Sequence, residues 1–307
     1  MSQPETTADH TAERHRPRLA ANPVAYRARD GTVENSKAAL DHAFADLADI
    51  GFTAVKADVP QGMTADEYRG WISSYGLTPS LSLFSSPFDE TVDITDEMER
   101  AKRFAGAQVS LGLDRTMVSS MSVPARMVEP AVGADFNKDR LALAIENCGI
   151  ICQVLQSQGL WPLHHPQIGG VFETEAEIIQ LLDTLGADVI GFGPDTGHLR
   201  WAGIDPAALI RRYADRIGGI HIKDCFPDYL DPAAREGLNY HQVEATKRLW
   251  TEPGRGVVDF DAVTAAMPED YEGDYMIEVV EPSVDSLHDS FKLSFEWARH
   301  ALNLAKP

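Results

Sequence analysis

The chain has 307 residues, of which 44% are hydrophobic, and a formal net charge of −20 at pH 7. This content suffices for a large buried core. The negative charge argues against nucleic acid or an anionic membrane as a partner, because both bind through basic patches. The three cysteines, Cys148, Cys152 and Cys225, include no CxxC pair, so a disulfide framework is not expected.

The first 17 residues are polar and mixed in charge, which predicts a disordered extension. They contain no apolar segment typical of a signal peptide, and the chain has no run of about 18 apolar residues that predicts a membrane span. We therefore expect a cytoplasmic protein whose folded part is one domain over residues 18–307.

Strand-like and helix-like segments alternate along this part of the chain. In chain order, the expected strands are 19–25, 52–59, 78–84, 116–120, 160–163, 189–193, 217–222 and 275–280. The expected helices are 36–50, 64–75, 93–111, 136–158, 174–185, 205–213, 259–267 and 284–304. A longer connection at 226–253 is expected to contain a helical piece at 242–250.

Eight strand–helix units predict an α/β fold of the (β/α)₈ TIM-barrel type. A doubly wound open sheet is the alternative, and the absence of GxGxxG after the first strand argues against it. The connection at 226–253 follows the seventh strand. It therefore belongs on the catalytic face of a barrel, where it can shape a pocket or act as a lid.

Polar side chains stand at or near the ends of four expected strands: His165, Asp195, His221 and Glu278. Taken singly, each has an ordinary explanation, such as a helix cap for Asp195 or a core histidine for His221. The carboxyl ends of barrel strands meet at one mouth, so the four can converge. Two imidazoles and two carboxylates would suit Mn²⁺, Co²⁺ or Zn²⁺.

The motifs around these residues resemble a known family. Residues 195–206 (DTGHLRWAGIDP) and 216–224 (RIGGIHIKD) are similar to the xylose isomerase-like TIM barrels, also called the sugar phosphate isomerase/epimerase family, and the nearest subgroup is the inosose dehydratases. Further similar segments are 22–25 (NPVA), 165–169 (HPQIG), 253–260 (PGRGVVDF) and 271–278 (YEGDYMIE). The resemblance spans roughly residues 18–285.

This resemblance implies metal ligation by Asp195, His221 and Glu278, with His165 standing where many family members have a glutamate. Mn²⁺ is the expected ion, with Co²⁺ or Zn²⁺ as alternatives. Gln167 stands where the subgroup often has a second histidine. A glutamine can hydrogen-bond a substrate hydroxyl, but it cannot shuttle a proton at neutral pH.

Glu278, His198 and Lys223 are the candidate catalytic residues. Candidate substrate contacts are His164, Gln167, Trp201, Arg255 and Lys56. His164 should point away from its neighbour His165 on a strand and is equally well explained as a packed histidine. Lys56 is interpreted as a substrate contact or a structural ion-pair partner rather than a base, and Arg255 is also explained as a surface loop residue.

The implied chemistry is removal of a proton next to the carbonyl of a polyol ketone, with a metal-stabilised enediolate. Loss of a β-hydroxyl then gives dehydration, whereas reprotonation gives epimerisation or isomerisation. His165 replaces the second carboxylate that two-sided epimerisation would use. We therefore expect a metal-dependent lyase acting on a keto-cyclitol or keto-sugar.

Four alternatives stay open. The chain can be a sugar isomerase or epimerase, or a 3-keto-glycoside (C-glycoside) cleaving subunit with a small partner chain. It can also be a non-catalytic sugar-binding barrel, against which the four intact ligand candidates argue. The acidic charge and too few ligands for a three-zinc cluster argue against an endonuclease of the related DNA-repair branch. A homo-oligomer is possible in each case.

Overall fold

The computed structural model describes residues 17–29, 32–33, 36–302 and 304. The expected N-terminal extension lies outside the described residues except for residue 17. The start of the folded domain at residue 18 therefore stays a prediction.

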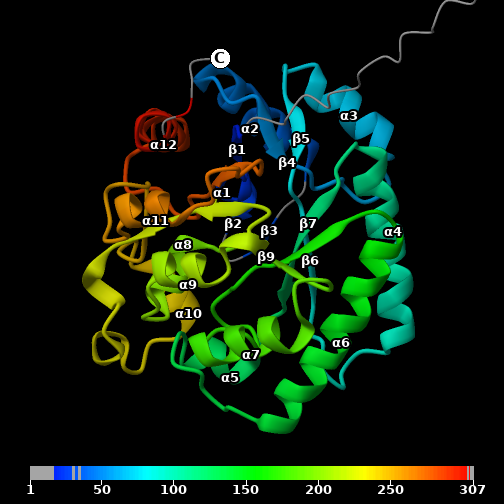
Figure 1. Ribbon diagram of the computed structural model, residues 1–307. Helices are drawn as coiled ribbons and strands as arrows, with labels where there is room; N and C mark the ends of the chain where they lie inside the picture. The colour runs from blue at the N-terminus through cyan, green and yellow to red at the C-terminus, as the bar shows by residue number, and fades with distance from the viewer. Residues whose placement is uncertain (1–16, 30–31, 34–35, 303, 305–307) are drawn as a thin grey trace, which may run out of the picture.

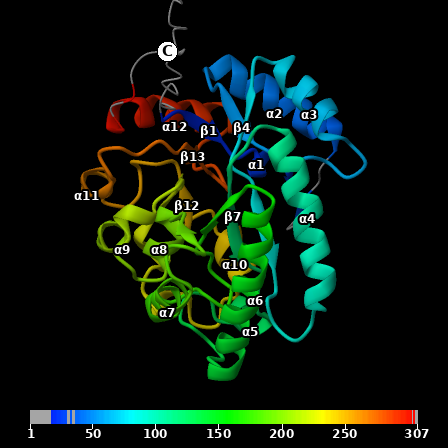
Figure 2. The same ribbon diagram turned by 45° about the vertical axis from the view of Figure 1, so that its right-hand side comes forward.

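Two parallel sheets form the central barrel (Figures 1 and 2). One has the strand order β10-β13-β1-β4-β5 and the other β6-β7-β8-β9. Their bounds are β1 Leu19–Ala21, β4 Ala54–Lys56, β5 Thr78–Ser80, β6 Leu83–Ser86, β7 Arg115–Ser120, β8 Trp161–His164, β9 Gly191–Phe192, β10 Ile220–Ile222 and β13 Tyr275–Ile277. The third expected strand, 78–84, is divided into β5 and β6.

Short bridges close the ring between the two sheets. Phe192 pairs with Ile217 and Asp195 pairs with His221, both in parallel register, which joins β9 to β10. With β5 and β6 counted as one divided strand, eight strand positions therefore surround the barrel axis, as the sequence predicts.

Helices pack around the outside of these strands (Figure 1). Their bounds are α1 Val24–Arg27, α2 Lys37–Ile50, α3 Ala65–Ser73, α4 Ile94–Ser110, α5 Pro124–Val128, α6 Lys138–Ser157, α7 Glu175–Leu185, α8 Thr196–Trp201, α9 Pro206–Arg212, α10 Tyr240–Ala245, α11 Phe260–Ala266 and α12 Leu287–Ala301. Thr64 and Thr174 form the capping boxes that open α3 and α7. No helix in the described ranges is long and apolar enough to cross a membrane.

Several boundaries differ from the prediction. The first strand ends at Ala21, before Pro23 and the short helix α1. Two antiparallel strand pairs were not predicted: β2 Ala28–Arg29 with β3 Thr32–Val33, and β11 Asp224–Cys225 with β12 Trp250–Thr251. The helical piece of the long connection is α10, five residues shorter at its C-terminal end than expected, because Lys247 has a positive φ of 57°.

A small apolar cluster fills the barrel interior: Ala20, Ala54, Leu81, Met117, Leu163 and Met276. A larger core lies between the strands and the helices. Glycines make room for the interior side chains, since a Cβ at Gly193 would collide with Met117 and one at Gly219 would collide with Leu81. The interior is thus a plug of packed side chains, and the mouth of the barrel lies directly above it.

Candidate metal centre at the barrel mouth

A layer of mostly polar side chains lies directly above the interior plug. Strand side chains alternate between the two faces, so the residue two positions beyond an interior residue faces the same way. The resulting pairs are Ala20 and Asn22, Ala54 and Lys56, Met117 and Ser119, Leu163 and His165, Gly193 and Asp195, Gly219 and His221, and Met276 and Glu278. The polar layer therefore lies at the carboxyl ends of the strands.

The structure brings all four predicted metal ligands together, and all four are buried. Ligand atoms of His165, Asp195 and His221 lie within 4.8 Å of one another. His221 Nδ1 is 3.7 Å from Asp195 Oδ2 and 3.1 Å from Glu278 Oε2. A second group with the same spacing consists of Asp195, Glu278 and His198. That these residues bind a metal remains a prediction.

Three ligand atoms in this group are buried without a hydrogen-bond partner in the described structure. They are Asp195 Oδ2 and both ring nitrogens of His221. The other oxygen of Asp195 accepts from the backbone N–H of His198, at 2.8 Å, and caps α8. Buried polar atoms are normally paired, because leaving one unpaired costs free energy. A cation would contact Asp195 Oδ2 and one of the two nitrogens of His221, so the donor set fits a metal.

His165 is oriented as a neutral ligand. Its Nδ1 lies 3.3 Å from the carbonyl oxygen of Gly193, to which an Nδ1–H donates, so Nε2 carries the lone pair. Burial, with the nearby His221 as a second cause, holds the pKa of His165 well below its usual value. The imidazole is therefore in the unprotonated form that metals require.

The pKa of His221 shifts in the other direction. Burial would lower it, but the carboxylates of Asp195 and Glu278 outweigh burial and raise it. In the metal-free protein, a proton on His221 thus neutralises part of the negative charge that a cation would neutralise. The proton and a metal ion would compete for binding to the imidazole.

Glu278 is held by two side chains in addition to its contact with His221. Its Oε1 accepts from Lys223 Nζ at 2.9 Å, and its Oε2 accepts from Asn22 Nδ2 at 2.5 Å. Burial would raise the pKa of Glu278, but Lys223 and His221 together hold it well below its usual value. Burial would likewise lower the pKa of Lys223, yet Glu278 and Asp195 raise it. The pair is therefore a carboxylate and an ammonium.

The three candidate catalytic residues form one connected chain. Lys223 Nζ lies 3.2 Å from His198 Nε2 as well as beside Glu278. Burial, followed by the charge of Lys223, lowers the pKa of His198 to about 4. Trp250 covers this chain, with its ring centre 4.0 Å from Lys223 Nζ and 5.0 Å from the His198 ring. Lys223 is thus the member that carries a proton at neutral pH.

Two predicted substrate contacts lie away from this group. His164 packs against Phe172 and Phe192, with ring centres 5.6 and 6.5 Å away, and burial lowers its pKa to about 3. It therefore faces the outer core, as strand alternation next to His165 requires. Trp201 is fully buried behind Trp250, at 5.4 Å, and supports the wall of the site rather than lining it.

The remaining predicted contacts lie around the mouth. Gln167 is half-buried and accepts from Ser119 Oγ at 3.4 Å, within the polar layer. The side chain of Arg255 is 46% exposed, and its Nε is 3.9 Å from Glu252. Lys56 belongs to the polar layer by strand alternation and is treated separately below.

Two neighbours of the site were not among the predicted site residues. Asn22 contacts Glu278, and its position just after the first strand is the signal that could have found it. Trp250 lies in β12, which pairs with β11, and no local sequence pattern links it to Lys223. Both were missed because their roles depend on contacts between distant parts of the chain.

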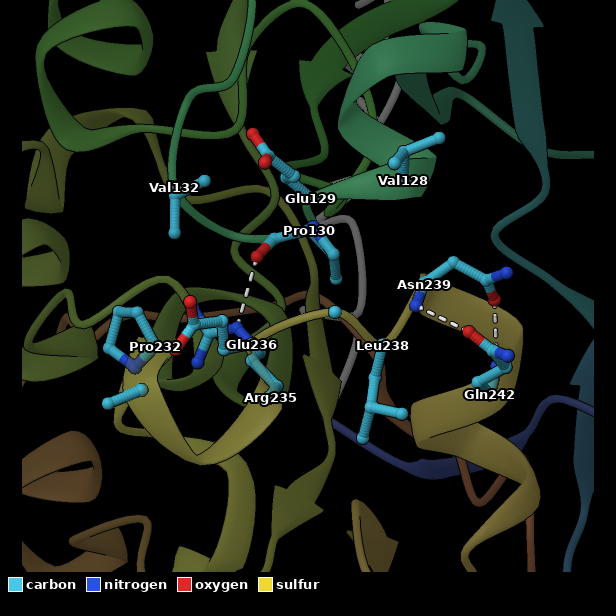
Figure 3. A pocket seen from close by; sticks show the side chains of 12 residues that line it. Val128, Glu129, Pro130, Val132, Pro232, Arg235, Glu236, Leu238, Asn239 and Gln242 are labelled. Atoms are coloured by element: carbon cyan, nitrogen blue, oxygen red, sulfur yellow. Dashed lines mark hydrogen bonds between the residues drawn. The ribbon is translucent and has the colours of Figure 1, made fainter.

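A cavity of about 540 Å³ lies at the rim, between the long connection after β10 and the connection after β7 (Figure 3). Arg235 joins the two connections by donating to the carbonyl oxygens of Pro130, at 3.1 Å, and Ala131, at 3.2 Å. Ala131 belongs to an apolar cluster with Trp201 and Trp250. None of the predicted site residues lines this cavity.

A profile of the family described as xylose isomerase-like TIM barrel matches residues 44–301. The chain belongs to this family. The expected TIM-barrel fold and family are therefore confirmed.

The inosose dehydratase of Geobacillus kaustophilus (strain HTA426) is 26% identical over 267 residues, which cover 84% of this chain and 85% of that protein. Among solved structures, an L-ribulose 3-epimerase superposes with a TM-score of 0.68 at 15% identity, over 94% of this chain and 95% of that one. The IOLI protein, solved with a zinc atom, superposes with a TM-score of 0.65 at 13% identity, over 93% and 98%. The relatives are thus named as lyases and isomerases, which confirms the expectation of an enzyme.

Proposed function

We propose that the protein is a divalent-metal-dependent lyase that dehydrates a keto-cyclitol or keto-sugar. The observation that carries this proposal is the convergence of His165, Asp195, His221 and Glu278 with buried ligand atoms left unpaired. The name of the curated relatives, inosose dehydratase, supports the same reaction.

The four residues would hold the ion, and their two imidazoles and two carboxylates suit Mn²⁺, the expected ion, as well as Co²⁺ or Zn²⁺. When bound, the ion would act as a Lewis acid toward the carbonyl of the substrate. His165 contributes a neutral nitrogen, whereas Asp195 and Glu278 contribute negative charge.

The chain supplies both halves of a proton transfer. Glu278 is a carboxylate and can take the proton next to the carbonyl. Lys223 holds a proton at Nζ, 2.9 Å from Glu278 Oε1 and 3.2 Å from His198 Nε2. We assign delivery of a proton to the departing hydroxyl to Lys223 itself, with His198 as the group that positions the ammonium, because His198 Nδ1 accepts from the backbone N–H of Ile168 at 3.3 Å. Trp250 shields this chain from water.

Elimination is favoured over epimerisation by the identity of residue 165. Epimerisation through proton removal on one face and return on the other needs a base on each side of the reacting carbon. His165 is oriented with its free nitrogen toward the metal position, so it is not placed to serve as the second base. A sugar isomerase or epimerase, and a subunit that cleaves 3-keto glycosides, are the competing activities.

The test is metal analysis of the purified protein together with a screen of inososes, 3-keto glycosides and free ketoses. Dehydration gives a new enedione absorbance, whereas epimerisation leaves the spectrum unchanged. We expect His165→Ala and Glu278→Ala to lose bound metal and activity. His164→Gln, which changes the neighbouring histidine outside the group, serves as the matched control. Full activity and retained metal in both alanine variants would contradict the proposal.

A further inference from the structure

The polar layer at the mouth has two halves. The four candidate ligands extend from β8, the segments after β9 and β10, and β13. The other half extends from β1, β4 and β7 and presents Asn22, Lys56 and Ser119. Asn22 already donates to Glu278, so Lys56 is the charged group that this second half contributes to the layer.

Lys56 forms an ion pair with Asp58 just beyond the end of β4. Its Nζ donates to Asp58 Oδ2 at 3.0 Å, and Arg27 Nη2 donates to the same oxygen at 3.0 Å. Ser82 Oγ donates to Asp58 Oδ1, also at 3.0 Å. Lys56 is 9% exposed and the side chain of Asp58 is 21% exposed, so solvent reaches both.

The backbone beneath this pair is fixed by two buried side chains. The hydroxyl of Tyr68, from α3, donates to the carbonyl oxygen of Lys56 at 3.0 Å. Gln108, from α4, donates to the carbonyl oxygen of Ala57 at 3.2 Å. Tyr68 and Gln108 are at most 2% exposed. The pair is therefore held by rigid elements, as a preorganised recognition group requires.

We infer that Lys56 and Asp58 bind the hydroxyl groups at the end of the substrate that points away from the metal ligands. An ammonium has three N–H donors, and Asp58 takes one from Lys56, which leaves donors for a substrate oxygen. The Asp58 carboxylate accepts from a hydroxyl. This inference rests on the proposed function, because it uses the same barrel mouth and adds the residues that select the substrate.

The pairing of charges around the mouth favours an uncharged substrate over a phosphorylated one. Lys56 shares Asp58 with Arg27, and Lys223 is paired with Glu278. With Asp195 beside Glu278, three carboxylates therefore balance the three cations Lys56, Arg27 and Lys223. A phosphate would need positive charge that is not matched in this way.

The backbone N–H groups of a glycine-rich loop beside the mouth are also already hydrogen-bonded. Its backbone N–H groups could cradle a phosphate, but those of Gly254, Gly256 and Val258 donate to the carboxylate of Asp224 at 2.9–3.0 Å. A carboxylate of the chain itself therefore occupies the place that an anion would take.

Lys56→Met and Asp58→Asn test the inference, with Lys37→Met as the matched control. Lys37 also donates to an aspartate, Asp41, at 2.7 Å, but on the exposed face of α2. In Mn²⁺-loaded protein, we would measure metal content, kcat and KM with a keto-cyclitol. Calorimetric titration with myo-inositol and with myo-inositol 1-phosphate gives a binding readout independent of turnover.

Loss of a hydrogen bond to a charged group predicts that Lys56→Met and Asp58→Asn raise KM and weaken myo-inositol binding about 10- to 100-fold. Metal content and kcat should change little, and Lys37→Met should match the wild type. Unchanged KM and binding in both variants, or tighter binding of the phosphate than of myo-inositol, would overturn the inference. Wild-type protein that binds no metal, yet binds myo-inositol through Lys56, would refute the proposed function and leave this inference standing.

Discussion

The two ends of the barrel both bury ionisable side chains, but their hydrogen bonding is opposite. At the bottom, Arg18 donates through Nε and Nη2 to the two oxygens of Asp274, at 2.8 and 2.9 Å, and Ser80 Oγ donates to the same carboxylate at 2.6 Å. At the mouth, Asp195 Oδ2 and both nitrogens of His221 have no hydrogen-bond partner among the described residues. Both ends are built from similar residue types, but among the described residues the buried carboxylate and imidazole atoms of the mouth lack a partner.

This difference separates a stabilising network from a binding site. In a TIM barrel, the bottom face serves stability and the mouth carries the chemistry. Unpaired buried polar atoms lower the stability of the protein, and they persist where a ligand uses them. Changes at the mouth should therefore affect ligand binding, whereas changes at the bottom should affect unfolding.

His221→Ala should have the largest effect. It removes the imidazole that lies between Asp195 and Glu278, so we expect kcat/KM to fall about 1,000-fold or more, the several kcal/mol that Lewis-acid catalysis supplies. Elemental analysis measures the loss of bound metal, and steady-state kinetics measures the loss of activity. In the metal-free protein, Asp195 and Glu278 raise the pKa of His221, so the unfolding midpoint of the variant should fall below the wild type at acid pH and approach it at alkaline pH, where the ring is neutral. A drop in the midpoint that is equally large at alkaline pH would show that the neutral ring itself serves stability.

Asp274→Ala should give the reverse pattern at the bottom. Breaking this partly buried, hydrogen-bonded ion pair leaves Arg18 without its carboxylate and should cost about 2 kcal/mol of the free energy of unfolding. Urea denaturation measures this cost. Metal content and kcat should remain within twofold of the wild type. A loss of metal in this variant would contradict the assignment of stability to the bottom and binding to the mouth.

Metal loading should stabilise the protein through the mouth alone. At an ion concentration 100 times the Kd, a ligand that binds only the folded state adds about 2.7 kcal/mol to the free energy of unfolding. Thermal unfolding with and without Mn²⁺ measures this gain. Asp274→Ala should show the full gain and Glu278→Ala should show little of it. Equal gains in both variants would indicate that the ion binds elsewhere.

Asp58 sharpens the comparison, because it lies near the mouth yet both of its oxygens already accept hydrogen bonds. Burial would raise its pKa, but Lys56 and Arg27 lower it to about 2. A lowered pKa in the folded state contributes stability above the unfolded value near 4, and this contribution disappears as the pH falls toward 2. The shift corresponds to about 2 kcal/mol. Urea denaturation of wild type and Asp58→Asn should show a gap at pH 6 that closes near pH 2, whereas a gap independent of pH would contradict the ion pairing.

The sequence predicted the parts of the fold that depend on local patterns. Eight strand–helix units predicted the barrel, and the positions of His165 and Asp195 after apolar strands predicted their convergence. The division of the third strand at Leu81 and Ser82 could not be predicted, because Pro79, the one proline in 78–84, lies within β5 rather than at the division. The long connection was placed on the correct face of the barrel. The strand that carries Trp250 could not be predicted, because it forms only by pairing with β11 across a long loop.

Side-chain direction separates the predicted site residues that meet at the mouth from those that pack elsewhere. Alternation predicts that His164 and His165 face opposite ways, but the sequence does not say which of them faces the interior. Leu163 in the interior plug decides this in favour of His165. Trp201 lies within a motif that resembles the family, yet it packs behind Trp250, because α8 turns that face of the helix away from the mouth.

The hydrogen bond between Asn22 and Glu278 joins residues 256 positions apart, from the first and last strands of the barrel. Contacts with so high a sequence separation are slow to form, because the entropy of closing a long loop must be lost before they can be made. In the proposed function, the metal site is complete only when the eighth strand has closed against the first. We therefore expect a nascent or truncated chain lacking β13 to bind no ion at this site.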